Sequence, residues 1–594
     1  MAPAVNDFSL QVATVNGSGS QSSNSVLLRA LFQMGIPVSG KNLFPSNIAG
    51  LPTWYTIRAS RDGWVARKKE LDLLVAMNGE TAAEDVAALR PGTPVVYDAP
   101  LGLDQGRADL GWYPVPFDAL VAPLAPDAKL RKLLRNMVYV GTLSRLLELE
   151  LPEVELAIGR VFDGKPKAVA LNVAAARAGF EHAGAFTRPP GLAARRMDAT
   201  RGKIIVDGNA AAAHGALFGG VTVLAWYPIT PSSSLAEALI ADLAAHRRGP
   251  DGTPSYAVVQ AEDELSAIGM VLGAGWAGAR AMTATSGPGI SLMGELAGLG
   301  AYAEIPAVVW DVQRVGPSTG LPTRTQQADL LSTAFLSHGD TGHPLLLPGS
   351  VEECFTFGHQ AFDLAERLQT PVFVLSDLDL GMNQWMAEPF RYPEAPMDRG
   401  KVLGRADLER LGGFARYADV DGDGIGWRTL PGTDHPRAAY FTRGSGHDER
   451  AGYSEKGEVY EKNMLRLARK LDGARALLPE PVATGAGAEV GVVAFGSSDP
   501  AVRESRAQLA AERGLAVDYL RVRAWPFAAA VRDFVAAHQR VYVVEQNRDG
   551  QLAGLLRLEL AAPLAGRLRS LARSDGLPLD ARTVTDAVLA HEEA

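Results

Sequence analysis

Four polar or glycine-rich segments in the middle of the chain each follow a predicted strand, and together they carry groups that can do chemistry. They are YPITPSS at 227–233, EDE at 262–264, TATSGPG at 283–289 and QRVGPSTGLPTR at 313–324. Their hydroxyls, carboxylates, guanidinium groups and open backbone N–H groups are suited to proton transfer and to anion binding. The sequence therefore predicts a ligand site built from this part of the chain.

The first segment holds a threonine between two prolines. Pro228 and Pro231 fix φ on either side of Thr230, so its hydroxyl is expected on a stiff turn at the carboxyl end of a strand. Ser232 and Ser233 are candidates to cap the helix that follows, because serine is a common N-cap residue. A capped strand-to-helix turn without a ligand is the alternative interpretation.

The acidic triplet opens a predicted helix. A carboxylate at a helix start gains about 0.3–1 kcal/mol from the helix dipole, which accounts for one or two acidic residues but not for three. One carboxylate of 262–264 is therefore a candidate for chemistry. The helix then carries Gly273, Ala274 and Gly275, small residues that would let another chain or a flat ring approach.

The last two segments are suited to binding anions. The turn at 286–289 leaves backbone N–H groups open to an anion or a ring nitrogen, although a plain tight turn is the alternative. The loop at 313–324 has no periodicity, and a run of about 12 such residues in a compact domain is usually functional or disordered. Arg314 and Arg324 make this loop suited to a carboxylate.

Short apolar runs alternate with helix-length stretches around these segments. This alternation predicts a doubly wound, mostly parallel α/β sheet, whose ligands bind at the carboxyl ends of the strands. The predicted strands are 221–225, 257–260, 281–285, 307–311 and 372–375.

The chain of 594 residues is too long for one core and is expected to form several domains. We expect an N-terminal α/β domain at 1–190, the doubly wound domain at 200–383, a connecting region at 384–488 and a third α/β domain at 489–594. Predicted N-terminal elements are strands 8–15, 73–77, 94–97 and 119–122 and helices 25–34 and 136–149. Predicted C-terminal elements are strands 490–495, 517–522 and 541–545 and helices 501–513 and 529–538.

Composition excludes several classes of function. The net charge is −9 and the charges are interspersed, so no basic surface for nucleic acid is expected. The only cysteine, Cys354, excludes a disulfide or a four-cysteine cluster within one chain. Residues 1–8 lack a signal-peptide pattern and no apolar run of about 18 residues occurs, so we expect a cytoplasmic protein without a membrane anchor.

The four segments, in this order and at this spacing, closely resemble the pyrimidine-binding domain of the 2-oxoacid:ferredoxin oxidoreductases, and the loop GPSTGLPT with its flanking arginines resembles the 2-oxoglutarate branch. NGSGSQSS at 16–23 resembles the γ domain of that family, fused ahead of the α part. VEQN at 544–547 and GQL at 550–552 resemble its transketolase C-terminal-like domain.

The resemblance implies thiamine diphosphate chemistry. A glutamate of the pyrimidine-binding domain would hydrogen-bond the aminopyrimidine ring and favour the imino tautomer that removes the thiazolium proton. That residue is expected to be Glu264, nine residues before Gly273, with Glu262 as the alternative. Further expected thiamine contacts are Tyr227, Pro228, Ile229, Ser286, Gly287 and Pro288.

The resemblance also implies a 2-oxoacid site and a coenzyme A site. Thr230 is expected to contact the substrate carboxylate, with Arg314 as its charged partner and Arg324 sharing that role. Val315 stands where the family usually has glycine, so the path of the loop departs from the family pattern. The expected coenzyme A contacts are Gly17, Ser18, Gly19, Ser20 and Ser22. This loop is not a dinucleotide fingerprint, because Ser22 takes the place of the third glycine, and a structural turn is the alternative.

Parts of a complete enzyme are missing from this chain. The diphosphate motif needs GDG followed by an asparagine about 25–30 residues later, but the match at 422–424 has no asparagine in 447–453. Asp419, Asp421 and Asp423 mimic the start of a calcium loop whose twelfth position is Leu430 rather than glutamate, so a polar turn is preferred and no metal is predicted in this chain. We expect a β-type partner to bring Mg²⁺, the diphosphate site and a [4Fe-4S] cluster.

The function expected from the resemblance is CoA-dependent oxidative decarboxylation of 2-oxoglutarate to succinyl-CoA, with electrons passed to ferredoxin, in an (αβ)₂ assembly. An enzyme of the same family acting on pyruvate or another 2-oxoacid is one alternative. A non-catalytic scaffold that binds coenzyme A or a partner chain is another. A self-contained thiamine lyase or synthase is disfavoured by the absent diphosphate motif.

Overall fold

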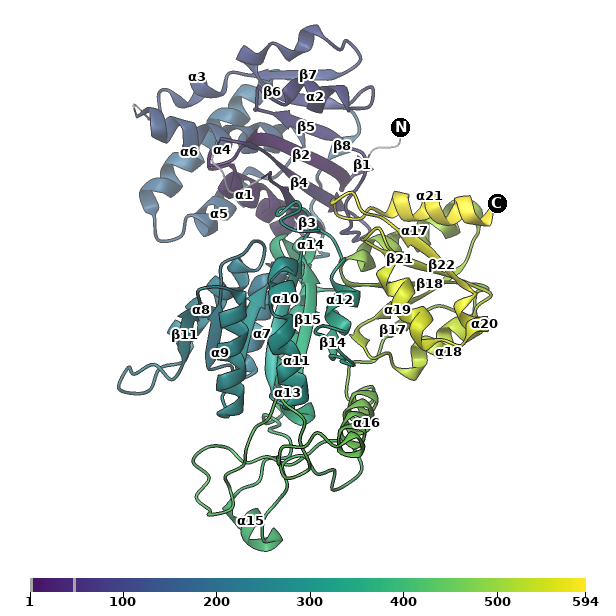
Figure 1. Ribbon diagram of the computed structural model, residues 1–594. Helices are drawn as coiled ribbons and strands as arrows, with labels where there is room; N and C mark the ends of the chain where they lie inside the picture. The colour runs from purple at the N-terminus through teal and green to yellow at the C-terminus, as the bar shows by residue number, and fades with distance from the viewer. Residues whose placement is uncertain (1–3, 46–49, 126, 594) are drawn as a thin grey trace. The chain divides into compact units, whose positions relative to one another are not determined.

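The computed structural model describes residues 4–45, 50–125 and 127–593, so Met1–Pro3 and Ala594, the ends of the predicted first and last domains, lie outside it. Contacts divide the chain into two compact units. The first comprises Met1–Val206, Asn383–Pro389 and Leu579–Thr583, and the second comprises Asp207–Met382, Phe390–Pro578 and Val584–Ala594. Both units contain sheets with packed helices, which confirms the multidomain α/β fold class (Figure 1).

The first unit is built on a six-stranded sheet of order β3-β4-β2-β5-β6-β7. Its strands are β2 Asp7–Val15, β3 Val38–Leu43, β4 Pro52–Ser60, β5 Leu73–Ala76, β6 Pro94–Asp98 and β7 Gly111–Val115. The strands predicted at 8–15, 73–77 and 94–97 are confirmed. The strand predicted at 119–122 is wrong, because this segment lies in helix α3, Phe117–Val121, whose Phe117 and Val121 are one helical turn apart and both buried.

Four main helices belong to the first unit, and the two that were predicted, at 25–34 and 136–149, begin earlier than the apolar periodicity indicates. The four helices are α1 Ser20–Gln33, α4 Ala128–Leu146, α5 Leu151–Val161 and α6 Pro166–His182. Polar first turns explain the difference, since Ser20–Ser25 and Lys129–Lys132 are mostly not apolar. The Gly/Ser loop therefore ends at Gly19, which has a positive φ of 84°, and Ser20 and Ser22 lie in the first turn of α1.

Close contact between α4 and α6 depends on two glycines. A Cβ added to Gly141 would lie 1.8 Å from the carbonyl oxygen of Ala176, and one added to Gly179 would lie 2.1 Å from that of Val138. We expect Gly141→Ala to destabilise this unit by about 1–3 kcal/mol, since the backbones must separate. Hydrogen exchange of α4 amides should accelerate in this variant and not in the control Gly159→Ala, where a Cβ meets open space.

The second unit contains a seven-stranded sheet of order β11-β10-β12-β13-β15-β14-β20. Its strands are β10 Val223–Trp226, β11 Ala257–Gln260, β12 Ala281–Thr285, β13 Ala307–Gln313, β14 Leu345–Leu346, β15 Pro371–Asp377 and β20 Ala524–Trp525. All pairings except that of β20 are parallel. The predicted doubly wound sheet is confirmed, and β13 and β15 are buried along their whole length, as both-face coverage by helices requires.

The main helices around this sheet are α7 Gly208–Phe218, α8 Ser233–His246, α9 Glu264–Trp276, α10 Gly287–Leu292, α11 Gly294–Tyr302 and α13 Val351–Leu368. Gly273, Ala274 and Gly275 were predicted to admit a flat ring or another chain. One of them, Gly275, instead packs against a neighbouring strand of the same unit. A Cβ on Gly275 would lie 2.0 Å from the Pro306 carbonyl oxygen, so this glycine lets α9 lie against the start of β13.

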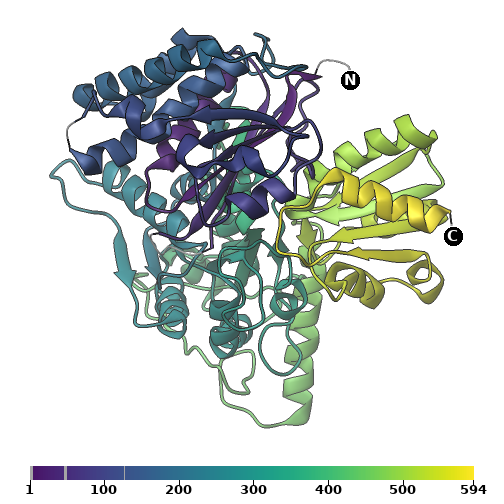
Figure 2. The same cartoon turned by 90° about the horizontal axis from the view of Figure 1, so that it is seen from above.

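A second sheet of the same unit has the order β17-β19-β18-β21-β22. Its strands are β17 Val482–Thr484, β18 Val490–Phe495, β19 Val517–Val522, β21 Arg540–Glu545 and β22 Leu568–Ala572. Helices α17 Asp499–Arg513, α18 Ala529–Ala537 and α19 Gln551–Glu559 are among those packed on it (Figure 2). These elements confirm the C-terminal strand and helix predictions. One apolar core joins the two sheets, since Val309 and Phe373 share a cluster with Phe495 and Leu520.

The connecting region at 384–488 contains the short strands β16, Trp385–Ala387, and β17 near its two ends. Between them lie helix α15, Arg405–Leu411, and a long helix α16, Gly457–Ala474, which we did not predict from the sequence. Asn463, Arg466 and Lys470 are buried on one face of α16, and Tyr460, Met464, Leu467 and Leu471 form an apolar stripe at helical spacing beside them. Arg466 and Lys470 point to the buried carboxylate of Glu304, at 2.6 and 2.9 Å. No helix in the described ranges is both long and apolar enough to cross a membrane.

Candidate functional site

The carboxyl ends of adjacent parallel strands bring the four predicted segments to one edge of the seven-stranded sheet. β10 leads into 227–233, β11 into 262–264, β12 into the glycine turn and β13 into the long loop. In the sheet β10 lies between β11 and β12, and β12 pairs with β13. This is the edge at which open α/β sheets bind ligands.

Arg314 joins the first and last of these segments. Its Nη1 donates to the carbonyl oxygen of Thr230 at 2.7 Å, and its Nη2 donates to that of Thr319 at 3.3 Å. The side chain is buried, and among the described residues its Nε has no hydrogen-bond partner. Burial lowers the pKa of Arg314, while the charges of Asp329 and Glu264 oppose that shift. Arg314 thus offers a buried cationic donor beside the Thr230 turn.

The three acidic residues of the triplet have separate places. Asp263 caps α9, where its carboxylate accepts the N–H of Ser266 at 2.7 Å, and Glu262 is exposed. Glu264 is only 6% exposed, and no described group donates a hydrogen bond to its carboxylate. A Cβ on Gly289 would lie 2.7 Å from Glu264 Cγ, so the glycine lets this side chain lie against the turn after β12.

The turn after β12 adds a buried hydroxyl to the carboxylate. Ser286 is the N-cap residue of α10, yet its Oγ is buried without a hydrogen-bond partner among the described residues. A buried polar group without a partner costs stability, so it needs an explanation such as a ligand. Glu264 and Ser286 thus offer a buried carboxylate and a buried hydroxyl to a hydrogen-bonding ligand. Gly287 and Pro288 follow at the start of α10.

The threonine turn is held by backbone and side-chain bonds of its own. Ser232 Oγ donates to the Ile229 carbonyl oxygen at 2.9 Å, and neither Ser232 nor Ser233 caps α8 through its side chain. Asn209 of α7 donates to the Pro231 carbonyl oxygen at 2.9 Å. Tyr227 and Pro228 are exposed at the same turn.

A hollow of about 800 Å³ opens at this site. Arg314, Gly287 and Pro288 line it from the seven-stranded sheet, and Asn547 and Arg548 line it from the loop after β21. Arg324 is not part of its lining. The Arg324 guanidinium donates to the Thr323 carbonyl oxygen at 3.0 Å. A Cβ on Gly576 would lie 3.0 Å from Arg324 Cβ, so its stem packs there. The structure therefore brings Arg314, but not Arg324, to the hollow.

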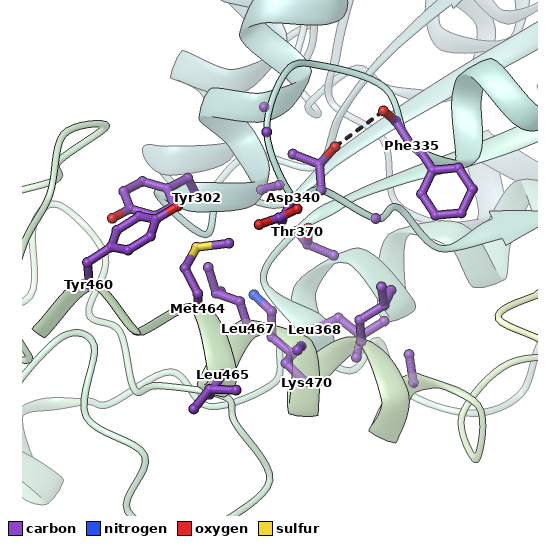
Figure 3. Close-up of a pocket in the computed structure, with 18 of the residues that line it drawn as sticks. Tyr302, Phe335, Asp340, Leu368, Thr370, Tyr460, Met464, Leu465, Leu467 and Lys470 are labelled. Atoms are coloured by element: carbon purple, nitrogen blue, oxygen red, sulfur yellow. Dashed lines mark hydrogen bonds between the residues drawn. The ribbon is translucent and has the colours of Figure 1, made fainter. Parts of the chain in front are cut away.

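A larger hollow in the second unit lies elsewhere. It has a volume of about 1070 Å³ and is lined by α11, the segment 335–344 and α16, with Met464 and Leu467 among its apolar side chains (Figure 3). None of the predicted site residues lines it. The larger hollow therefore lies apart from the predicted site residues.

The Gly/Ser loop predicted for coenzyme A belongs to the first unit. Gly17 is exposed and Ser22 is half-buried, whereas Ser18 and Ser20 are buried. The Ser18 carbonyl oxygen accepts Asn136 Nδ2 at 2.6 Å, and Ser20 Oγ accepts the Thr14 hydroxyl at 2.9 Å. These bonds fix the loop to α4 and β2. Gly17 and Ser22 are its more accessible members.

The acidic turn of the connecting region has protein partners. Lys401 Nζ lies 2.6 Å from Asp421 and 2.8 Å from Asp423. Asp419 accepts the N–H groups of Gly422 and Gly424 and pairs with an arginine of α16. Asp421 and Asp423 thus bind the ammonium of Lys401, while Asp419 binds backbone N–H groups and Arg469.

Sequence reasoning missed a buried polar cluster beside the site. Asp311 interrupts the apolar strand β13, and Asp329 lies beyond the long loop. Gln327 accepts from the Gln546 N–H at 3.1 Å and from Ser498 Oγ at 3.0 Å, which ties the two sheets together. A charged residue inside an apolar strand was the available signal for Asp311.

Comparisons with known proteins bear on this site. The family described as pyruvate flavodoxin/ferredoxin oxidoreductase, thiamine diphosphate-binding, matches residues 214–395, which include all four segments. The family described as pyruvate ferredoxin/flavodoxin oxidoreductase matches residues 9–182.

Whole proteins match over most of the chain. The alpha subunit of 2-oxoacid:ferredoxin oxidoreductase 2 from Aeropyrum pernix is 32% identical over 98% of this chain and 97% of its own length. The 2-oxoglutarate synthase subunit KorA of Methanothermobacter marburgensis is 34% identical over 61% of this chain and 95% of its own length. The solved 2-oxoglutarate:ferredoxin oxidoreductase of Magnetococcus marinus, with 2-oxoglutarate, coenzyme A and succinyl-CoA bound, is 30% identical with a TM-score of 0.88, covering 98% of this chain and 99% of that chain.

Proposed function

Because the chain belongs to the 2-oxoacid:ferredoxin oxidoreductases, as an alpha subunit, we propose that it takes part in CoA-dependent oxidative decarboxylation of 2-oxoglutarate to succinyl-CoA, with electrons passed to ferredoxin. The observation that carries this proposal is the hydrogen bond from Arg314 to the Thr230 carbonyl oxygen, beside the buried carboxylate of Glu264. Relatives described as acting on 2-oxoglutarate support this choice of 2-oxoacid.

The substrate carboxylate is bound by Arg314 and Thr230 in this proposal. The partnerless Nε of Arg314 is a charged donor, and hydrogen bonds between ions are roughly twice as strong as neutral ones. The two carbonyl bonds of Arg314 hold its guanidinium plane, so little side-chain entropy is lost on binding. Arg324 is the alternative cation if the loop rearranges.

Thiamine diphosphate is the cofactor that these residues fit. Glu264 would hydrogen-bond a ring nitrogen of its pyrimidine and Ser286 would contact the same ring. Tyr227, Pro228, Ile229, Gly287 and Pro288 would line the place of the cofactor. Glu262 is too exposed to be our first choice for the proton. When bound, this cofactor supplies a thiazolium carbon that stabilises the carbanion left by decarboxylation. Gly17, Ser18, Gly19, Ser20 and Ser22 are proposed to contact coenzyme A.

A β-type partner is part of the proposal. The chain has one cysteine, buried Cys354, and so cannot ligate an iron–sulfur cluster by itself. Elements next to the site expose large apolar side chains, namely Tyr227, Val259, Leu265, Met270 and Leu292. Exposed apolar groups rimmed by polar residues are typical of interaction surfaces. We propose that the partner brings Mg²⁺, the diphosphate site and the [4Fe-4S] cluster, in an (αβ)₂ assembly.

Anaerobic co-expression with a β-type chain tests this function. We expect the purified complex to contain thiamine and iron, and to reduce viologen with 2-oxoglutarate plus coenzyme A faster than with pyruvate. The isolated chain should be inactive, since half of the site is missing. Faster reduction with pyruvate would change the substrate but keep the reaction. Suppose instead that the complex contains thiamine and iron but fails to reduce viologen with any 2-oxoacid tested. That result would refute the proposed enzyme and favour a binding scaffold.

A further inference from the structure

Asp311 and Asp329 form a buried pair of carboxyl groups behind Arg314. Asp311 is fully buried, and its two oxygens have no hydrogen-bond donor among the described residues. Its side chain contacts that of Asp329, whose Oδ2 is also buried without a donor. Two carboxylates in contact cannot both stay ionised at low dielectric, so this geometry requires a proton between them.

The pair contacts two elements of the candidate site, strand β13 and the turn after β12. Asp311 and Gln313 share one face of β13, and Gln313 Oε1 accepts the Asp329 N–H at 3.0 Å. A Cβ on Gly287 would lie 2.8 Å from Asp329 Oδ2 and 2.9 Å from Oδ1, so the carboxyl group supports the turn after β12. Asp329 also lines the hollow that Arg314 lines.

We propose that Asp311 and Asp329 share one proton and act as positioning residues, keeping a single negative charge behind Arg314 and supporting the Ser286–Gly287 turn. This inference rests on the proposed function only where it invokes the 2-oxoacid. Asp311 donates the shared proton and Asp329 accepts it. Loss of the proton places a second negative charge beside Arg314 and weakens its attraction for a carboxylate.

The charges around the pair determine the direction of the effect. Burial, reinforced by the neighbouring carboxylate, raises the pKa of Asp311, and burial also raises that of Asp329 although Arg314 opposes it. Glu264 on α9 acts on Arg314. Asp377, at the end of β15, instead accepts from Ser497 at 2.6 Å and Thr325 at 3.2 Å. The pair is therefore expected to keep its shared proton at pH values where ordinary carboxyl groups are ionised, and to lose it as pH rises further.

Infrared spectroscopy and kinetics of the αβ complex test the pair. In wild type we expect a protonated-carboxyl C=O band at neutral pH that shifts in D₂O and that Asp311→Asn removes from the difference spectrum. We also expect kcat/KM for the 2-oxoacid to fall on the alkaline side to a lower plateau, because the second negative charge weakens the attraction of Arg314 for the substrate carboxylate without abolishing it. Asp311→Asn keeps a hydrogen-bond donor to Asp329 but cannot ionise. Its kcat/KM should therefore be the same at neutral and at alkaline pH.

The two measurements separate this inference from the proposed function. If the band is present but no 2-oxoacid is turned over, the pair stands and the proposed reaction fails. If Asp311→Asn leaves the band in place, or shows the wild-type alkaline fall, the shared proton is refuted. If Asp311→Asn does not assemble, the wild-type complex alone tests the pair. The infrared C=O band and kcat/KM should then change with pH at the same midpoint. Different midpoints would refute the shared proton.

Discussion

Glu264→Gln should lower turnover of the αβ complex by about 10²–10⁴-fold, the usual contribution of a positioned acid–base group. The amide matches the carboxylate in shape, so it should still pack against Gly289 and leave assembly intact. It cannot hold a proton at a ring nitrogen as a carboxylate does. Viologen reduction at saturating 2-oxoacid and coenzyme A measures the loss, with bound thiamine determined after denaturation.

Glu262→Gln is the matched control, since Glu262 is exposed two residues earlier. It makes the same chemical change at the same strand end and should keep near-wild-type turnover. A severe loss in Glu262→Gln with normal rates in Glu264→Gln would show that the other carboxylate contacts the ring. Equal, mild effects in both variants would argue against a glutamate-dependent cofactor.

The sequence predicted that the four segments follow neighbouring strands, and the parallel pairing of those strands brings the segments to one sheet edge. Polar segments after β10, β12 and β13 meet whenever those strands pair, whatever their loops do. Individual contacts could not be predicted in this way. The bond from Arg314 to the Thr230 carbonyl oxygen joins residues far apart in sequence, and it depends on how both loops fold.

Failures of prediction share one physical cause, which is that burial is a tertiary property. The segment 119–122 is apolar and short, a pattern that a strand and one turn of helix share. Helix α16 has apolar residues at helical spacing that could have predicted it, but its burial of Arg466 and Lys470 against the Glu304 carboxylate depends on tertiary contacts that no periodicity shows. Asp311 and Asp329 reveal their relation only when β13 and the following loop are folded together.

Arg314→Met should raise KM for the 2-oxoacid by about 10–100-fold, because a hydrogen bond to a charged group contributes about 1.5–3 kcal/mol. Methionine retains an unbranched apolar stem but has no donor for the substrate carboxylate. Arg314→Lys keeps the charge and loses the planar fork, so it should fall between wild type and methionine. Steady-state kinetics of the αβ complex, with KM for coenzyme A measured alongside, gives the size of each effect.

Arg324→Met decides whether the effect is specific to one arginine. Arg324 bonds to the neighbouring Thr323 and packs near Gly576, outside the hollow that Arg314 lines, so its loss should change KM much less. If Arg324→Met raised KM more than Arg314→Met, the carboxylate role would pass to Arg324. Because Arg314 also holds the Thr230 turn, thiamine content must be measured in each variant. A KM effect with full thiamine content isolates substrate binding, whereas loss of thiamine would indicate that Arg314 acts through the turn.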